Sequence, residues 1–317
     1  MNIPEVLKQV EEEIARLPLG TSPKSLYDPI RYIMKLGGKR LRPLLTCLSY
    51  SLYRNDPSKI IRYAAAVEAF HNFTLMHDDI MDKAPLRRGK PTVHEKYNSN
   101  TAILSGDVML VKVYDMFLSL PDHQLREVIR LFNKTASEVC EGQQMDMDFE
   151  TMKKVSEKQY LEMIRLKTAV LLGFSLELGA ILADAPEKDR KALYDFGVNI
   201  GVGFQLMDDL LDVYADQKKF GKTVGGDIVS NKKTYLLIKA LERKRAELNK
   251  WLSAKTFDKK KKVAAVTKIY DSAGVRELTE KMAEKYFEAG YRCLDDVDNE
   301  NKGTLVAFAK SLAARQK

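Results

Sequence analysis

The chain has 317 residues, 45% of them hydrophobic, so it can bury a large core and is not a disordered tail protein. Its 52 lysines and arginines against 44 aspartates and glutamates give a formal net charge of +8, a modest excess that does not by itself indicate nucleic-acid binding. Three widely spaced cysteines, Cys47, Cys140 and Cys293, form no CxxC pair. This pattern favours neither a disulfide framework nor a thiolate zinc site, and it fits a reducing, cytoplasmic compartment.

Apolar residues recur at helical spacing in almost every segment, whereas strict strand alternation is scarce. The first segment, residues 1–17, is an acidic amphipathic stretch without the apolar core of a secretory signal. Further along, Ser156 and Gln159 match a capping box and predict a helix start. Because no long Pro, Gly or Ser linker interrupts the pattern, we expect an all-α fold with one helical domain over residues 1–317.

The longest apolar window runs from Ala169 to Ala183 and is interrupted by Ser175 and Glu177. It is shorter than the roughly 18 residues that a bilayer span needs. The sequence therefore predicts no transmembrane segment.

Basic residues form two clusters in the first third of the chain. The run GGKRLRP places Lys39, Arg40 and Arg42 beside a glycine pair that would end the preceding helix, and RRGKP follows at residues 87–91. Arginine forks and lysine point charges match phosphate oxygens. Two separate clusters indicate two phosphate-bearing groups.

Between these clusters, the helix predicted over residues 60–82 ends in DDIMD. Asp78 and Asp82 are one turn apart, about 6 Å, on one helix face. Such carboxylates repel one another and need compensating cations, and they suit Mg²⁺, which is often shared with substrate phosphates. His71 lies two turns before Asp78 and could donate a hydrogen bond to a diphosphate. A solvated acidic face remains the alternative reading of this motif when it is taken alone.

The same pattern recurs as DDLLD, Asp208 to Asp212, at the end of a second apolar helix. Two facing DDxxD helices in a bundle would line a pocket with carboxylates able to hold several divalent ions. Gln205 lies on the same side of its helix as Asp208. Lys167 and Thr168 sit within another apolar helix, where the adjacent hydroxyl favours a polar cavity over an outward-facing charge.

Polar segments follow both acidic motifs, from Lys83 to Ser99 and from Gln217 to Asn231, and we interpret them as the mouth of a binding site. Lys222 and Lys232 flank the second segment and could close over a diphosphate. The run Lys259 to Lys262 is interpreted as a solvated loop between helices.

Together these residues resemble the trans-prenyltransferases, the short-chain isoprenyl diphosphate synthases, and are most similar to archaeal-type geranylgeranyl diphosphate synthases. The resemblance covers roughly residues 30–310 and rests on GGKRLRP, HNFTLMHDDIMD, LRRGKPT, GQQMD, LKTA, FQLMDDLLD, and GKTVGGDI followed by NKKTYL, in family order. It implies an isoprenoid synthase-type single-domain helical bundle around a deep central cavity, with the two aspartate motifs facing each other near its mouth. The usual assembly in this family is a homodimer.

The resemblance also implies roles for individual residues. The direct Mg²⁺ ligands would be Asp78, Asp82 and Asp208, supported by Asp79, Asp209, Asp212, Gln143 and Asp146, and three Mg²⁺ would hold the allylic diphosphate. Isopentenyl diphosphate would be bound by Gly38, Lys39, Arg42, His71 and Arg88. The allylic diphosphate would be bound by Arg87, Lys167, Lys222 and Lys232, and the developing allylic cation would face Thr168 and Gln205.

The implied reaction is a head-to-tail condensation of isopentenyl diphosphate with C5 to C15 allylic diphosphates. Mg²⁺ and cationic side chains stabilise the leaving diphosphate, the allylic C–O bond ionises, the double bond of isopentenyl diphosphate attacks, and a proton is lost to the released diphosphate, the implied base. Water would capture the cation, so the segment Gln217 to Asn231 is a candidate lid.

Product length should depend on side chains below the first motif. Phe73 lies five residues, about 7.5 Å, before Asp78 along the helix, with the small Thr74 beside it and Phe70 about one turn deeper. In the family this pattern implies a C20 product, geranylgeranyl diphosphate. Because Phe70 adds bulk, a C15 farnesyl product or a mixture of both remains open.

Three other functions compete with this interpretation. A terpene cyclase shares one DDxxD motif but does not need a second diphosphate site, which the two basic clusters indicate. A non-catalytic partner subunit would have lost ligands, whereas both aspartate triplets are intact. A nucleic-acid-binding protein would carry a basic stripe without interleaved carboxylates, and no nucleic-acid partner is expected.

Overall fold

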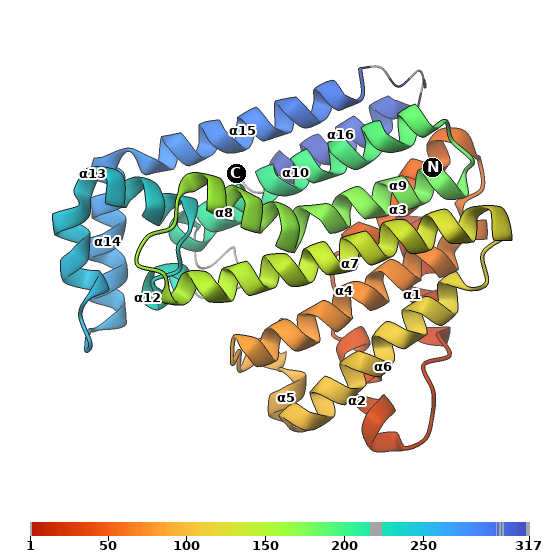
Figure 1. Ribbon diagram of the computed structural model, residues 1–317, viewed down its shortest axis with the longest axis horizontal. Coiled ribbons are helices and arrows are strands. Elements are labelled where there is room, and N and C mark those ends of the chain that lie inside the picture. The colour runs from red at the N-terminus through yellow and green to blue at the C-terminus, as the bar shows by residue number, and fades with distance from the viewer. Residues whose placement is uncertain (1, 216–223, 296, 298, 300, 315–317) are drawn as a thin grey trace. The chain divides into compact units, whose positions relative to one another are not determined.

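The structure is a computed structural model that describes residues 2–215, 224–295, 297, 299 and 301–314. Figure 1 shows helices throughout the described chain, which confirms the all-α prediction. Within these residues, β structure is limited to an antiparallel hairpin of two short strands, β1 (Leu86–Arg87) and β2 (Lys90–Pro91).

The helices of the first half of the chain are α1 (Ile3–Arg16), α2 (Lys24–Lys35), α3 (Leu41–Tyr53), η1 (Pro57–Ile60), α4 (Ile61–Met81), α5 (Val93–Lys96), α6 (Ser99–Phe117) and α7 (Asp122–Thr151). Those of the second half are α8 (Glu157–Ile164), η2 (Arg165–Ala169), α9 (Val170–Leu182), α10 (Glu187–Tyr214), α12 (Gly226–Ser230), α13 (Tyr235–Leu252), α14 (Lys259–Ala273), α15 (Val275–Cys293) and α16 (Lys302–Ala314).

The chain divides into two compact units. The first unit comprises Met1–Lys134, Phe174–Leu193 and Asn299–Lys302, and the second comprises Thr135–Gly173, Tyr194–Asp298 and Gly303–Lys317. Helices α7, α9 and α10 each contribute residues to both units. That the chain forms a single domain stays a prediction.

Helix α4 is the centre of the first unit and packs against α1, α3 and α6. Its run of small residues, Ala64 to Ala66, is fully buried, and Phe70 is 1% exposed. A helix that is apolar on nearly every side is buried along its length, and polar side chains are then tolerated chiefly at its ends. The aspartate motif lies beyond this buried stretch, at the C-terminal end of α4.

The second unit has its own hydrophobic core, which α8, α10, α13, α14 and α15 share. Leu206 and Leu210 of α10 lie in this core with Leu236 of α13 and Val266 of α14. Because Leu206 and Leu210 face inward, the three aspartates of the second motif, Asp208, Asp209 and Asp212, lie on the other faces of α10.

Local capping explains where several helices begin. Ser156 and Gln159 form the predicted capping box at the start of α8. The run Lys259 to Lys262 was expected to be a loop, but this interpretation is wrong, because it forms the first turn of α14 behind the N-cap Asp258. Its last residue, Lys262, is buried, since it faces the second unit's interior rather than solvent.

The polar segment after the first motif is also more ordered than a loop. It contains the β1–β2 hairpin, helix α5 and the N-cap of α6, where Asn98 accepts a hydrogen bond from the backbone of Thr101. The hydroxyl of Thr92, which follows strand β2, donates to the carbonyl of Ala84 before strand β1 at 2.7 Å and so ties the two ends of the hairpin together. The basic side chains in this segment are therefore presented from a fixed turn.

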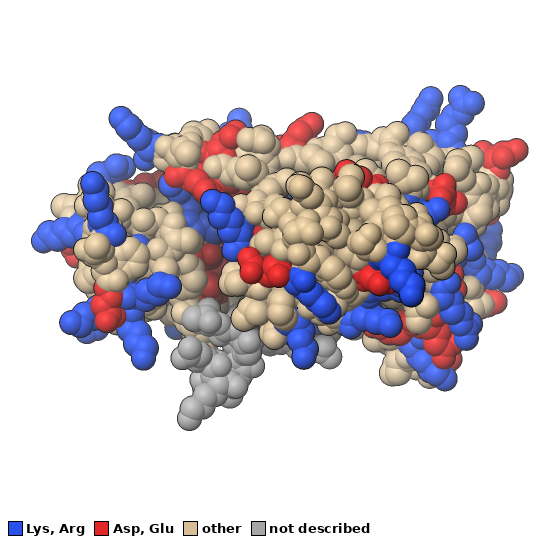
Figure 2. Space-filling model, turned by 90° about the horizontal axis from the view of Figure 1, so that it is seen from below, with Lys and Arg blue, Asp and Glu red and all other residues tan. Residues whose placement is uncertain are grey.

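Charges on the surface are mixed. On the face shown in Figure 2, lysine and arginine side chains alternate with aspartate and glutamate instead of forming a continuous basic stripe. Within the described residues, no helix combines the length and the apolar character that crossing a membrane requires.

Candidate active site

The C-terminal turn of α4 carries the first aspartate motif. Carboxylates at this end of a helix add to the negative end of its dipole, so they need cations close by. Arg87, from strand β1, supplies one: its Nε and Nη2 donate to the two oxygens of Asp79 at 2.8 and 2.7 Å. Nη2 also lies 3.8 Å from Asp78. Burial raises the pKa of Asp79, and this ion pair opposes the shift.

This pairing separates the three aspartates of the motif. Asp79 is 2% exposed and is fixed by Arg87, whereas Asp82 is exposed and Asp78 is partly exposed. The outer two carboxylates are thus the ones presented toward solvent.

The hairpin turn presents the second basic cluster. Arg88 and Gly89 connect the strands with positive φ angles of 53° and 73°, which is the geometry of a two-residue type I′ turn. The guanidinium of Arg88 rests against Gly38, where a Cβ atom would lie 3.0 Å from Nη2. The lack of a side chain at Gly38 therefore leaves room for Arg88.

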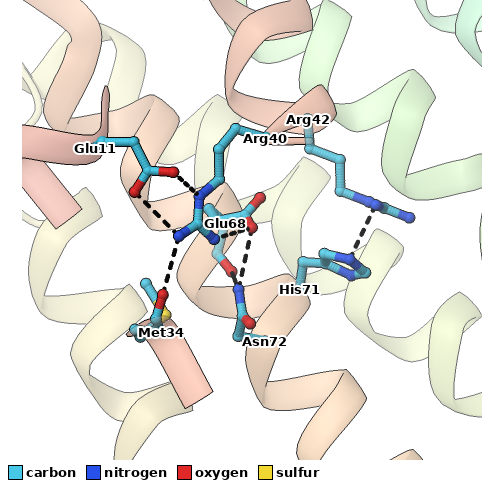
Figure 3. Close-up of polar contacts among 7 residues, drawn as sticks. All are labelled: Glu11, Met34, Arg40, Arg42, Glu68, His71 and Asn72. Atoms are coloured by element: carbon cyan, nitrogen blue, oxygen red, sulfur yellow. Dashed lines mark hydrogen bonds and ion pairs between the residues drawn. The ribbon is translucent and has the colours of Figure 1, made fainter. Parts of the chain in front are cut away.

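The first basic cluster meets α4 beside this turn. Nη1 of Arg42 lies 3.1 Å from Nε2 of His71 (Figure 3). Burial and the nearby Arg42 and Arg88 guanidinium groups hold the pKa of His71 well below its usual value, so the imidazole is neutral and Nε2 accepts from Arg42. Burial lowers the pKa of Arg42 to about 10, which keeps it cationic at neutral pH.

Nε of Arg42 is buried and has no hydrogen-bond partner among the described residues. A buried guanidinium N–H without an acceptor is costly, and an anionic ligand would satisfy it. Together with the exposed Lys39 and the adjacent Arg88, it forms a cationic subsite that fits a diphosphate group.

In the second unit, the middle aspartate is again the one turned inward. Asp209 is 5% exposed and accepts hydrogen bonds from the hydroxyl of Tyr160 and, at 3.1 Å, from Nε2 of Gln205. Burial and the neighbouring Asp227 raise the pKa of Asp209. Oε1 of Gln205 in turn accepts from the hydroxyl of Thr168 at 3.1 Å.

Lys167 and Thr168 lie in η2, a π turn between α8 and α9. Such turns interrupt an α-helix locally and are frequent at functional sites. Gly142 of α7 makes room for this turn, since a Cβ atom there would lie 2.2 Å from the backbone nitrogen of Lys167. The π turn places consecutive polar side chains in contact with α7 and α10.

Asp146 joins two of the predicted diphosphate ligands. Its Oδ2 lies 2.7 Å from Nζ of Lys167 and 3.6 Å from Nζ of Lys232. The two lysines lower the pKa of Asp146 although burial opposes the shift. Nε2 of Gln143, one turn earlier, is buried and has no hydrogen-bond partner among the described residues.

Two residues of this site were not predicted as members from the sequence. Asp227 of α12 donates its backbone N–H to Oδ2 of Asp212 at 2.9 Å, and Tyr160 of α8 holds Asp209. Asp227 follows the glycine pair of GGDI, which was the available signal. Tyr160 carries no local signal, because its partner lies 49 residues away.

The structure thus gathers the predicted residues into two groups. Those described in the first unit are Gly38, Lys39, Arg42, His71, Asp78, Asp79, Asp82, Arg87 and Arg88, and those in the second are Gln143, Asp146, Lys167, Thr168, Gln205, Asp208, Asp209, Asp212 and Lys232. Lys222 and the rest of residues 217–223, the first part of the predicted lid, lie outside the described residues.

The predicted chain-length residues lie deeper in the first unit. Phe73 and Phe70 of α4 pack together with ring centroids 5.7 Å apart, and Phe70 packs edge-on against Phe132 at 5.0 Å. Thr74 directs its hydroxyl back to the carbonyl of His71. These aromatic rings continue to Phe117 and Phe174.

The donor set fits Mg²⁺ shared with a substrate. Among the described residues, no three carboxylate, imidazole or thiol groups are gathered into a ready metal site. Each motif instead presents outer carboxylates, Asp78 and Asp82 in one and Asp208 and Asp212 in the other. Mg²⁺ is commonly held by one or two carboxylates, waters and substrate phosphates, which is what this arrangement allows.

Comparisons with known proteins agree with these features. Residues 23–272 match the family model described as polyprenyl synthetase. The chain is 39% identical over 317 residues to the geranylgeranyl pyrophosphate synthase of Geoglobus acetivorans, which covers 97% of this chain and 96% of that protein. It is 44% identical over 238 residues to a short chain isoprenyl diphosphate synthase of Methanocaldococcus jannaschii, covering 75% and 72%. A crystal structure of a geranylgeranyl pyrophosphate synthase matches with a TM-score of 0.95 and 43% identity, covering 98% of both chains.

Proposed function

The chain belongs to the polyprenyl synthetase family, and we propose that it is a short-chain isoprenyl diphosphate synthase acting on isopentenyl and allylic diphosphates. The observation that carries this function is the division within both DDxxD motifs. The middle aspartate of each is buried and fixed by protein groups, whereas the outer carboxylates are at least partly exposed, with Asp78 3.8 Å from Arg87. This pattern supports Mg²⁺-mediated binding of a diphosphate.

The first unit is proposed to bind isopentenyl diphosphate. Its diphosphate would be held by Lys39, Arg42 and Arg88, with close backbone approach at Gly38. His71 is neutral and bonded through Nε2 to Arg42, so its Nδ1–H is the group able to donate. This subsite holds the nucleophilic partner without assistance from a metal.

The allylic diphosphate is proposed to contact Lys167, Lys232 and Arg87, together with Lys222. Asp146 holds Lys167 and Lys232, and a diphosphate would compete for both ammonium groups. The carboxylates Asp78, Asp82 and Asp208 would hold Mg²⁺, three ions in the ternary complex, and the bound metal would supply Lewis-acid stabilisation of the leaving diphosphate. Arg87 keeps Asp79 in place during this step.

Thr168 and Gln205 are proposed to face the allylic cation. The hydroxyl of Thr168 donates to Gln205, so its lone pairs remain available to a positive charge. The amide of Gln205 is oriented because Asp209 accepts from its nitrogen end and is itself fixed by Tyr160. These hydrogen bonds determine that the oxygen end of the Gln205 amide points toward Thr168.

The proposed main product is the C20 chain, geranylgeranyl diphosphate. Phe73, 9% exposed, is the first large ring below the motif, and Phe70 behind it is locked into the aromatic cluster. The small Thr74 leaves Phe73 as the first obstacle to a growing chain. A C15 product would instead indicate that Phe70 and Phe73 form one combined floor.

A homodimer in the cytoplasm is proposed as the working form. Helix α6 exposes Leu104 and Val111 at 58% and 56%, and Leu118 just beyond its end at 61%. These residues are seven apart and therefore share one face. An exposed apolar stripe of this kind is typical of a protein interface, and a second copy of this chain is its proposed occupant.

The function can be tested with the purified protein, Mg²⁺, isopentenyl diphosphate and the C5, C10 and C15 allylic diphosphates offered one at a time, with products separated by chain length. We expect condensation with all three primers and C20 as the end product. Chelation of Mg²⁺ should abolish the reaction. Absence of condensation with every primer would overturn the proposed function.

A further inference from the structure

Arg40 lies in the middle of GGKRLRP, between the proposed diphosphate ligands Lys39 and Arg42, yet its own side chain is only 2% exposed. It cannot reach a bound diphosphate from this position. The backbone at Arg40 has a φ angle of 46°, in the left-handed region that favours glycine. A non-glycine residue keeps this strained conformation only when its surroundings fix it, so the contacts of the Arg40 side chain must hold the backbone in place.

The guanidinium of Arg40 is bonded to three separate parts of the first unit (Figure 3). Its Nε and Nη2 donate to the two carboxylate oxygens of Glu11 on α1, at 2.7 and 3.1 Å. Nη1 donates to Glu68 on α4 at 2.7 Å, and Nη2 also donates to the carbonyl of Met34 on α2 at 2.9 Å. Four of the five N–H groups are used, which fixes the planar fork in one orientation.

Glu68 links this fork to the substrate side. It is 2% exposed, and Asn72 donates to both its carboxylate and its backbone carbonyl. One turn further along α4, His71 contacts Arg42. The same stretch of α4 thus holds Arg40 through Glu68 and Arg42 through His71.

The glycines before Arg40 do not fix the segment themselves. Gly37 and Gly38 have positive φ angles of 76° and 152°, which glycine adopts readily because it has no side chain. The segment from residue 37 to residue 42 therefore owes its position to the contacts that follow the glycines. Arg40 supplies contacts to α1, α2 and α4 together.

We propose that Arg40, clamped by Glu11 and Glu68, is a positioning residue that presents Lys39 and Arg42 to the diphosphate of isopentenyl diphosphate. The inference rests on the proposed function and adds to it a dependence of this subsite on α1, the N-terminal helix. The clamp is expected to act on one substrate only, because none of its contacts involves the proposed allylic ligands Arg87, Lys167 and Lys232.

The test uses Glu11→Ala, because the side chain of Glu11 is 49% exposed and its removal leaves the folded core intact. We expect the KM for isopentenyl diphosphate to rise about five-fold, with the KM for the allylic diphosphate and kcat changed less than about two-fold. Glu12→Ala, at the exposed neighbour on the same helix, is the matched control and should leave all three constants unchanged. Arg40→Lys keeps the charge but loses the fork, and should raise the same KM further.

The outcomes distinguish a failure of the clamp from a failure of the proposed function. A selective rise in the KM for isopentenyl diphosphate supports the clamp. An unchanged KM in Glu11→Ala, or an equal deterioration of both KM values and kcat that follows a loss of thermal stability, overturns it while wild-type activity leaves the proposed function in place. If the wild-type chain forms no product with any primer, the proposed function fails first.

Discussion

The middle carboxylate of each aspartate motif is directed into the protein. Asp79 is held by two parallel hydrogen bonds from Arg87, and Asp209 by Tyr160 and Gln205. The outer carboxylates are less buried, although Asp212 also accepts the backbone N–H of Asp227. Neighbouring residues of one short motif thus have different proposed purposes: the inner carboxylate stabilises the fold, and the outer ones are proposed to bind the ligand.

This division predicts opposite responses to two substitutions in the first motif. Asp79→Ala should lower the free energy of unfolding by about 2 kcal/mol, because it leaves the guanidinium of Arg87 without its carboxylate. Asp82→Asn should leave stability unchanged within about 0.5 kcal/mol and reduce the condensation rate about 100-fold or more. Urea unfolding and product formation measure the two effects. Equal destabilisation by both substitutions would contradict the division.

The neutral charge state of His71 leads to a prediction about the pH dependence of the reaction. Burial and the neighbouring guanidinium groups keep its pKa well below 6.5, so it is uncharged near neutrality. His71→Gln should therefore reduce kcat/KM for isopentenyl diphosphate by the same factor at about pH 6 and about pH 8, since that ratio reports groups of the free enzyme. A factor that shrinks as the pH rises would show that the imidazole acts as a cation, contrary to the structure.

At the level of the elements, features that depend on local sequence could be predicted, whereas features that depend on long-range contacts could not. The all-α class and the helix start at Ser156 followed from periodicity and a capping box. The run Lys259 to Lys262 was wrongly predicted as a loop, because charge alone does not show which face of a helix a lysine occupies. Lys262 lies on the inward face of α14 and donates to the Val229 carbonyl and the Asn231 side chain. The part played by Tyr160 could not be predicted, since its contact depends on the packing of α8 against α10.

The π turn of η2 gives a prediction at this scale. Gly142→Ala would bring a Cβ atom within 2.2 Å of the Lys167 backbone nitrogen, which cannot move aside as a flexible side chain could. We expect a destabilisation of about 2 kcal/mol and a marked loss of kcat, because the turn carries Lys167 and Thr168.

Gly303→Ala provides the matched control, since nothing lies within 4 Å of the position that its Cβ would occupy. It should leave stability and activity essentially unchanged. Wild-type behaviour of Gly142→Ala in both measurements would show that the close approach of α7 to η2 is unimportant.

For the whole molecule, the family match from residue 23 to residue 272 spans residues of both compact units. Each unit contributes one aspartate motif and its own basic groups, so neither unit carries a complete set of the proposed ligands. The sequence predicted these ligand sets through their motifs. It could not assign them to two units, because α7, α9 and α10 pass from one unit to the other without a break in composition.

The proposed homodimer is tested at this scale by Val111→Glu, which places a charge in the exposed stripe of α6. Light scattering after size-exclusion chromatography should give twice the mass of one chain for the wild type and the mass of one chain for the variant. Leu86→Glu, at an equally exposed leucine on the hairpin, should keep the wild-type mass. A wild-type chain that elutes with the mass of a single chain would exclude the homodimer.

The π turn at Arg165–Ala169 also bears on how the gene can tolerate changes in length. A π turn accommodates one residue more than the α-helical turn it replaces, and the flanking helices keep their registers on either side. Loss of one codon in this stretch would let the segment relax into an uninterrupted α-helix, with α8 and α9 both preserved. The side chain of Lys167 would then swing by about 100° around the helix axis, away from Asp146. A one-residue deletion at this point would therefore yield a folded protein without catalytic activity.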